Sequence, residues 1–218
     1  MSFGLGKGRS LDAGDAGFDI SVLPRADAGR LHPNIFFPRA SARVEIEIGS
    51  GKGTFLLQQA SLEPETNFLG IEWTGEFWKY AADRVRRSGL TNVRILRGDA
   101  TQFIRHWVDD GVAQVLHLYF SDPWPKTRHH KRRVVQDQTL ADFHRVLTKG
   151  GELRIVTDHD ALWQWDIEHI ERAPHLFSRG AFAPPQSAGA GELVGTNFER
   201  KFRREGRPFH AMTLRRID

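Results

Sequence analysis

Hydrophobic and polar positions follow two alternating patterns from residue 42 onward. Short runs with apolar residues at every second position predict β-strands, and longer amphipathic runs between them predict helices. Strands are expected at 42–48, 67–72, 92–100, 113–120, 152–158 and 208–216, with one short strand near Leu176 and Phe177. Helices are expected at 54–60, 75–89, 101–111, 134–151, 160–173 and 196–206.

The alternation of strand and helix predicts one α/β domain built from βαβ crossovers around a mostly parallel sheet. Residues 41–218 are expected to form this domain, and residues 1–40 an N-terminal extension that is partly disordered. Within the extension, residues 1–17 resemble a mobile tail. Residues 32–38, "HPNIFFP", carry large apolar side chains and are expected to pack onto the domain. Residues 173–195 are expected to be irregular.

Composition narrows the possible classes of protein. The chain has 218 residues, of which 39% are hydrophobic and 27% charged, as is ordinary for a soluble globular protein. Neither a membrane span nor a signal peptide is visible, so we expect a cytoplasmic protein. The absence of cysteine excludes disulfides, thiolate catalysis and cysteine-bound metal sites. A net charge of +4 shifts the expectation toward a polyanionic partner.

Acidic residues stand at the carboxyl end of each central strand. Glu47 lies at the end of the first, Glu72 of the second, and Asp99, Asp122 and Asp158 follow the next three. Ligands of open α/β sheets bind at this edge. So many acids disfavour a phosphate-containing ligand, which needs N–H donors and a helix N-terminus. The segment "GSGKG" is also too short between its glycines to be a P-loop.

S-adenosylmethionine fits these acids better, because it has a sulfonium, an ammonium, a ribose diol and an adenine amino group, and no phosphate. Carboxylates can accept hydrogen bonds from, or balance the charge of, all of these groups. Gly49 and Gly51 would allow the backbone to approach the methionine part closely. Two alternatives are structural: Glu47 could face solvent on its strand, and Glu72 or Asp99 could cap the following helix.

The segments "EIGSGKG", "FLGIE", "RGDA", "SDPWPKTRHHKRR" and "TNFERKFRREG" together resemble the bacterial tRNA (guanine-N7-)-methyltransferase family, from about Val44 to Arg216. The basic run after the fourth main strand is the most specific part. The resemblance implies a Rossmann-like class I methyltransferase fold with seven strands, the last antiparallel. It also implies methylation of tRNA at N7 of the variable-loop guanine, guanine 46.

The resemblance assigns roles to individual residues. It implies that Asp122 is catalytic and that S-adenosylmethionine is held by Glu47, Gly49, Gly51, Glu72, Asp99, Ala100 and Asp122. It implies that the substrate is bound by Lys126, Asp158, Thr196, Asn197, Phe198 and Glu199. The basic run supplies the expected RNA contacts, Arg128, His129, His130, Lys131, Arg132 and Arg133.

Some of these residues have a structural alternative. The basic run could be a solvated surface, and Trp124 could either pack in the protein or stack on a base. Thr196 and Glu199 form the pattern of a helix capping box, although we favour contact of Glu199 with guanine. His129 and His130 lack metal-ligand partners at suitable spacing, so no metal is expected.

At the level of function, the alternatives are methylation of another RNA and non-catalytic RNA binding. The sequence is compatible with a monomer or a homodimer.

Overall fold

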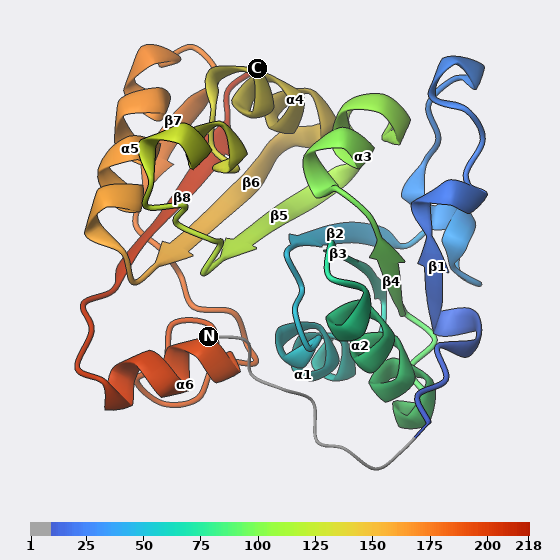
Figure 1. Cartoon of the computed structure of the whole chain (residues 1–218). Coiled ribbons are helices and arrows are strands. Elements are labelled where there is room, and N and C mark those ends of the chain that lie inside the picture. The colour runs from blue at the N-terminus through green and yellow to red at the C-terminus, as the bar shows by residue number, and fades with distance from the viewer. Residues whose placement is uncertain (1–9) are drawn as a thin grey trace.

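The structure is a computed structural model that describes residues 10–218. Figure 1 shows one twisted sheet with helices on both faces. Its eight strands lie in the order β1-β4-β3-β2-β5-β6-β8-β7. Their bounds are β1 Gly17–Asp19, β2 Arg43–Ile48, β3 Thr66–Glu72, β4 Val93–Arg97, β5 Ala113–Tyr119, β6 Leu147–Thr157, β7 Phe177–Gly180 and β8 His210–Arg216.

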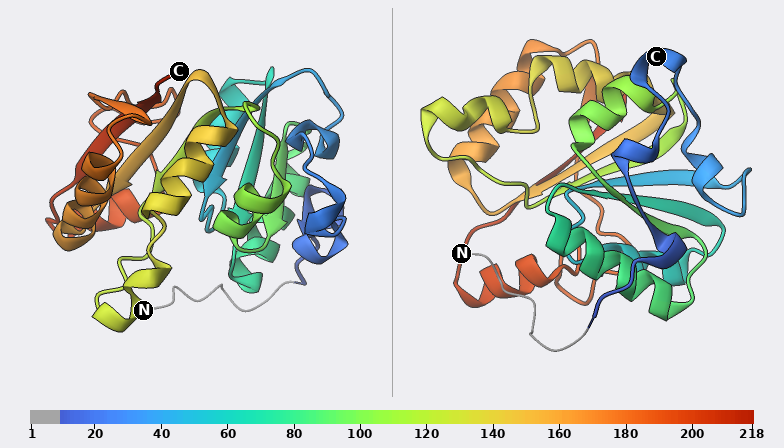
Figure 2. Two further views of the ribbon diagram at one scale, coloured as in Figure 1. Left: turned by 90° about the horizontal axis from the view of Figure 1, so that it is seen from above. Right: turned by 45° about the vertical axis from the view of Figure 1, so that its right-hand side comes forward.

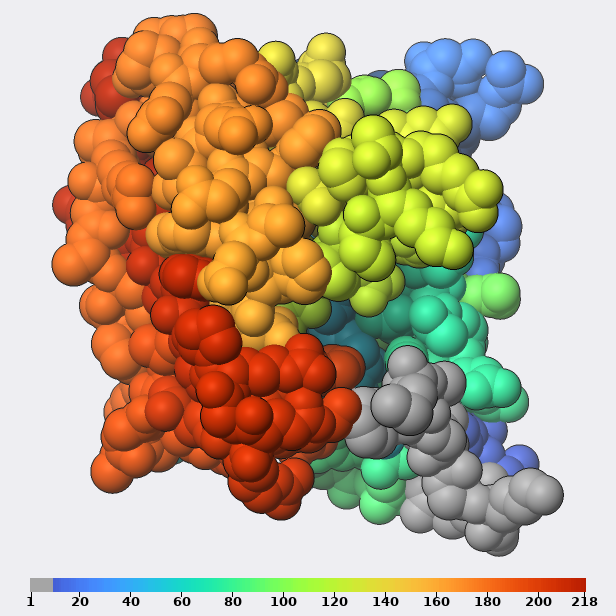
Figure 3. Space-filling view, turned by 60° about the vertical axis from the view of Figure 1, so that its left-hand side comes forward, coloured from blue at the N-terminus to red at the C-terminus, as the bar shows by residue number. Residues whose placement is uncertain are grey.

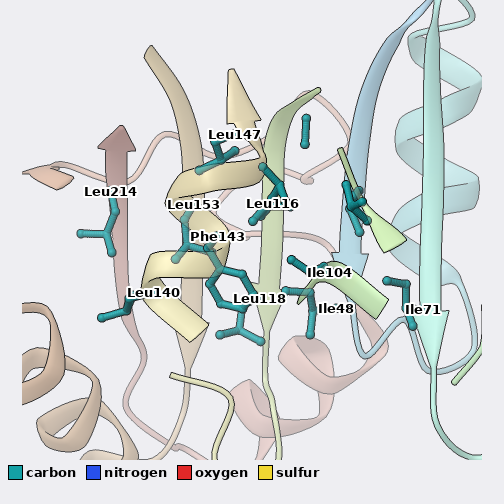
Figure 4. Packing of buried hydrophobic residues seen from close by; sticks show 14 of the residues in the cluster. Ile48, Ile71, Ile104, Leu116, Leu118, Leu140, Phe143, Leu147, Leu153 and Leu214 are labelled. Atoms are coloured by element: carbon teal, nitrogen blue, oxygen red, sulfur yellow. The ribbon is translucent and has the colours of Figure 1, made fainter. Parts of the chain in front are cut away.

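Two hydrophobic clusters attach the helices to the sheet. Helices α1 and α2 pack on one face over Phe68, Val93 and Ile95. Helices α3, α4 and α5 cover the other face, where Phe143 and Leu140 of α4 meet the strands (Figure 4). The helices are α1 Thr54–Leu62, α2 Gly75–Ser88, α3 Ala100–Trp107, α4 Asp137–Val146, α5 Asp160–Arg172 and α6 Asn197–Arg204.

The direction of the strands agrees with the prediction, and their number does not. β8 runs antiparallel to both β6 and β7, so the last strand is reversed as expected. The short strand expected near Leu176 and Phe177 is confirmed as β7. The sheet has eight strands and not seven, because β1 adds to its edge by parallel pairing with β4.

The N-terminal extension is therefore folded where it is described. Gly17 pairs with Ile95 in the sheet, and Ala16 is buried. The prediction of a mobile tail is wrong for residues 14–17, which form the 3-10 helix Gly14–Ala16 and the start of β1. A three-residue strand is too short to show a period. Residues 1–9 of the predicted tail lie outside the described residues. The segment 32–38 packs as expected, with Phe37 buried in the core.

Two helices end at least four residues earlier than their patterns predicted, because α3 ends at Trp107 and not at residue 111, and α4 is shortened similarly. The sequence suggests a helix up to residue 151, whereas α4 ends at Val146. Leu147 instead pairs with Ala113 and begins β6, with a register shift before the regular ladder from Val115 onward. An apolar residue that continues a helical period can equally begin a buried strand, so periodicity alone does not find this boundary.

Parallel strands β2 to β6 bring their carboxyl ends to one edge of the sheet. The 3-10 helix η5, Thr127–Arg132, projects from this edge (Figure 2). Helix α6 lies beyond the ends of β5 and β6 (Figure 1). Residues far apart in sequence thus surround a single edge of the sheet.

Among residues 10–218, no helix combines the length and hydropathy needed to cross a membrane.

Helix α5 contains a buried acid that makes stability depend on pH. Asp166 is 1% exposed, and burial raises its pKa to about 8, while the charge of Arg133 acts in the opposite direction. An unfolded Asp releases its proton near pH 3.9. Between about pH 4 and pH 8 the folded state therefore binds more protons than the unfolded state, and its stability falls as pH rises.

Asp166→Asn removes this titration. We expect the difference in melting temperature, variant minus wild type, to rise from pH 5 to pH 8 and then to level off. The contribution is at most ~1.4 kcal/mol for each pH unit in this window. Thermal unfolding across this range is the measurement. A difference that stays constant with pH would show that Asp166 is ionised throughout.

Candidate active site

A glycine-rich turn joins β2 to α1 at the sheet edge. Gly49 and Gly51 have φ of 78° and 53°, in the left-handed region that disfavours residues with a Cβ atom. The N–H groups of Gly49 and Ser50 donate to the carbonyl of Ile71, at 2.9 and 3.0 Å. The N–H of Gly51 donates to Glu72 Oε2 at 2.8 Å. The turn is thus fixed against the end of β3.

A pocket of about 390 Å³ opens beside this turn. In Figure 3, α6 and the segment around η5 lie on the same face of the molecule, with a hollow between them. The pocket is lined from the turn, α1, α2, β5 and α6 by Glu47, Gly49, Ser50, Gly51, Lys52, Thr54, Phe55, Phe77, Tyr119, Thr196, Asn197, Phe198, Arg200, Lys201 and Arg204. It therefore contains acidic, apolar and basic side chains at once.

Glu47 lies on the pocket wall and is only 4% exposed. Its Oε2 atom accepts no hydrogen bond from any residue in the described range. Burial raises the pKa of Glu47 well above its usual value, and the charge of Glu72 raises it further. The alternative of a solvent-facing Glu47 is therefore wrong. A buried carboxyl with a free oxygen beside a pocket is suited to a cationic ligand.

A polar group next to Glu47 escaped the sequence analysis. His117 Nε2 lies 2.8 Å from Glu45 Oε2, and His117 Nδ1 lies 2.7 Å from the hydroxyl of Tyr119. All three are buried, and the ring of Phe55 packs on both His117 and Tyr119. The signal was present in the sequence, because Glu45 and Glu47 occupy the positions of β2 that alternate with its apolar face.

Glu72 and Asp99 lie at the carboxyl edge of the sheet and also accept hydrogen bonds from backbone N–H groups of the protein. Glu72 Oε1 accepts from the N–H of Thr74 at 2.8 Å, in addition to the bond from Gly51. Asp99 caps α3, because its Oδ1 accepts from the N–H groups of Thr101 and Gln102. The capping alternative for Asp99 is confirmed. Ala100 is the first residue of that helix.

Asp122 lies in a loop of unusual backbone after β5. Its side chain is exposed, and Phe120 and Trp124 on either side of it have positive φ, 54° and 43°. Such values are uncommon for large side chains and cluster at functional sites. Trp124 is half-buried; its ring stacks on His129 at 5.8 Å, and the guanidinium of Arg132 lies 4.8 Å from its centre.

The basic run is exposed over most of its length. Arg128, Lys131 and Arg132 are exposed, and His129 and His130 are half-buried. Arg133 differs, because it is 4% exposed and its Nε donates to the carbonyl of Pro123 at 2.9 Å. The prediction that Arg133 contacts RNA is therefore not supported, since its guanidinium lies inside the protein.

Three of the six residues expected at the substrate, Thr196, Asn197 and Phe198, line the pocket. Thr196 caps α6 by accepting from the N–H of Glu199, and Asn197 Nδ2 donates to Thr54 on α1 at 3.0 Å. Phe198 is 40% exposed and lines the pocket. Lys126 is exposed at the start of η5, away from the pocket lining, and Asp158 accepts from Arg207 at 2.6 Å.

Glu199 has a structural role instead. Its side chain is fully buried, and its oxygens accept from the N–H groups of Leu193, Val194 and Gly195. It also pairs with Arg203 at 2.6 Å. The prediction that Glu199 contacts guanine is not supported, because its carboxylate already binds the preceding turn.

The described residues contain no group of three His, Asp or Glu side chains that could hold a metal ion.

Sequence analysis missed several residues that line the pocket, among them Lys52, Phe55, Phe77 and Arg204. Their types carried no signal, because aromatic and basic residues on helices and turns are usually part of the core or a solvated face.

Known proteins resemble this chain over most of its length. A family model described as "Putative methyltransferase" matches residues 41–212. The tRNA (guanine-N(7)-)-methyltransferase of Agrobacterium fabrum is 34% identical over 218 residues, which cover 97% of this chain and 93% of that protein. The protein of the same name from Streptococcus thermophilus is 32% identical over 191 residues, which cover 88% and 87%.

Solved structures support the fold alone. An aminoglycoside-resistance methyltransferase aligns with a TM-score of 0.53 at 19% identity, over 80% of this chain and 87% of that one. An rRNA methylase from Streptococcus thermophilus aligns with a TM-score of 0.53 at 12% identity, over 81% and 88%. The sheet is thus that of the class I methyltransferases. From the matches over nearly its full length, the chain belongs to the tRNA (guanine-N(7)-)-methyltransferase family.

Proposed function

We propose that this protein transfers the methyl group of S-adenosylmethionine to N7 of the variable-loop guanine of tRNA. The observation that carries the proposal is the buried carboxyl of Glu47, whose Oε2 has no partner within the described part of the chain. It lines a pocket on the face that also carries an exposed basic segment (Figure 3). The pocket suits a cation-bearing cofactor without phosphate, and the segment suits an RNA backbone. We also propose that the protein acts in the cytoplasm, where it would meet a tRNA substrate.

The residues at the edge fit the groups of S-adenosylmethionine. Glu47 would face its positively charged methionine part, and the glycine turn would allow close approach of the backbone. Glu72 retains a second lone pair on each oxygen, because each accepts one backbone N–H bond. We assign these lone pairs to the ribose hydroxyls. Asp99 Oδ2, Ala100 and the glycine turn complete the proposed cofactor site.

The chemistry requires little of the protein beyond placement and charge. Guanine N7 carries a lone pair and no proton, so its reaction needs no general base at that atom. Orientation alone can supply roughly 7–11 kcal/mol of barrier reduction. When bound, S-adenosylmethionine supplies the methyl group, and positive charge appears on the purine. We propose that the carboxylate of Asp122 stabilises that charge.

Recognition of tRNA would involve both sides of the pocket. Arg128, Lys131 and Arg132 are exposed cations that can neutralise phosphates. Across the mouth, Asn197 and Phe198 begin α6, and the exposed ring of Phe198 offers a surface on which a base can stack. We propose Lys126, Asp158 and Thr196 as further residues of the substrate side.

Nucleoside analysis tests the proposed function directly. Purified protein is incubated with unmodified tRNA and methyl-labelled S-adenosylmethionine, and the labelled nucleoside is identified after digestion. We expect label in 7-methylguanosine, and none in a matched tRNA whose variable-loop guanine is replaced by adenine. In a parallel incubation with a ribosomal RNA fragment, label in that fragment and none in tRNA would indicate another RNA substrate. Binding of tRNA without any transfer would indicate a non-catalytic protein.

Glu72→Ala tests the cofactor site. The variant should bind S-adenosylmethionine ~10- to 100-fold more weakly, because charge-assisted hydrogen bonds contribute about 1.5–3 kcal/mol. Its affinity for tRNA should change little. Isothermal calorimetry on the folded variant, checked by circular dichroism, makes the measurement. An unchanged affinity for the cofactor would remove Glu72 from the site.

Asp122→Asn tests the electrostatic role, because it keeps the shape of the side chain and removes its charge. We expect the single-turnover rate of methyl transfer to fall ~10²- to 10³-fold, as for other groups aimed at developing charge. Binding of tRNA and cofactor should be retained. A transfer rate close to that of wild type would show that the charge of Asp122 does not assist the reaction.

A further inference from the structure

Arg133 is the one arginine of the basic run that is buried. It is 4% exposed, whereas its neighbours Lys131 and Arg132 are exposed. Its Nε donates to the carbonyl of Pro123 at 2.9 Å, and its Nη1 donates to the carbonyl of Ala161 at 3.4 Å. The guanidinium therefore links the loop after β5 to the first turn of α5.

Helix α5 fixes this guanidinium in place. Its carbon lies 5.0 Å from the centre of the Trp165 ring. The indole N–H of Trp165 in turn donates to the carbonyl of Val135 at 2.7 Å, just beyond Arg133 in the chain. Arg133 is thus held by stacking and by two carbonyl groups, which is a geometry that suits a planar guanidinium better than an ammonium.

The loop that Arg133 holds has an unfavourable backbone. Phe120 and Trp124 both have positive φ, and Pro123 lies between them, directly after Asp122. Residues in such conformations persist only where the surrounding structure fixes them. The bond from Arg133 to Pro123 is a contact of this kind, one residue away from the proposed catalytic carboxylate.

We infer that Arg133 is a positioning residue, which holds the loop 120–124 so that Asp122 is fixed for the reaction, and that it does not contact RNA. The inference rests on the proposed function, in which Asp122 stabilises charge on the guanine. It also divides the basic run into two parts, exposed cations that face the RNA and one buried arginine that orders the loop.

Arg132 provides the matched control, because it is the preceding residue, has the same charge and is exposed. Its guanidinium contacts the Trp124 ring and, within the described part of the chain, donates no hydrogen bond to the backbone of residues 120–124. The experiment compares wild type, Arg133→Ala, Arg133→Lys and Arg132→Ala. For each protein, tRNA affinity is measured at several salt concentrations, cofactor affinity by calorimetry, and methyl transfer in single turnover at saturating concentrations.

We expect Arg132→Ala to weaken tRNA binding and to flatten the slope of log affinity against log salt by ~0.7–0.9, the loss of one phosphate contact. Arg133→Ala should keep the wild-type slope and cofactor affinity. Its transfer rate should fall ~10- to 100-fold, because small misplacement of a reacting group is costly. Arg133→Lys should transfer at an intermediate rate, since an ammonium can keep a bond to Pro123 without stacking.

Two results would overturn the inference. A flattened salt slope for Arg133→Ala, like that of Arg132→Ala, would make Arg133 an RNA contact. A methyl-transfer rate of Arg133→Ala equal to that of wild type would show that the contacts of Arg133 with the loop do not affect the reaction. If Arg133→Ala does not fold, Arg133→Lys decides by the same measurements. A wild-type protein without methyl transfer would contradict the proposed function, and the salt slopes would still decide whether Arg133 contacts RNA.

Discussion

The carboxyl group of Glu47 lies at the edge of a buried sheet, and its Oε2 atom has no hydrogen-bond partner among residues 10–218. The proposed site surrounds this group. Burial of Glu47 is costly unless a ligand supplies the missing partner. The glycine turn keeps side chains out of the space above it, and α6 closes the same space from the other side. A positively charged group would satisfy Glu47 most directly, which is the physical reason to place the methionine part of the cofactor there.

The cost of burying a carboxyl group without a partner also explains why the neighbouring buried acids have partners within the protein. Glu45 is paired with His117, and each oxygen of Glu72 accepts a backbone N–H. These bonds satisfy neighbouring carboxylates at least in part within the protein, whereas Oε2 of Glu47 has no hydrogen-bond partner among residues 10–218. Asp122, for which we propose a role in the reaction, differs again, because it is exposed and lies in a loop. Its place then depends on how that loop is held, which is the role inferred for Arg133.

Much of this edge could be predicted from the sequence. Parallel strands carry their carboxyl ends to one side, so acids after successive strands were expected to lie together. The alternation of residues on β2 likewise implied that Glu47 and Val44 face opposite sides. β1 could not be predicted, because three residues among glycines and alanines show no period.

The roles of Arg133 and Glu199 depended on distant partners. Arg133 follows a run of exposed cations and looks like one of them until Trp165 and Ala161 of α5 are placed beside it. Glu199 matches a capping box locally, but its oxygens accept from residues 193–195. In both cases the residue type indicated a polar contact, but the sequence did not indicate where the side chain points. That orientation is set by a neighbouring element of the fold.

Proton release on cofactor binding tests most directly whether Glu47 is the counter-charge. Its raised pKa means that the free protein holds a proton on Glu47 at pH values where a free glutamate is ionised. A bound cation should favour the ionised form and expel that proton. The measurement is calorimetry of S-adenosylmethionine binding in buffers of different ionisation enthalpy. Wild type should release a proton on binding. Glu47→Gln should release no proton and should bind the cofactor more weakly than wild type. Equal proton release and equal affinity in the two proteins would contradict the account.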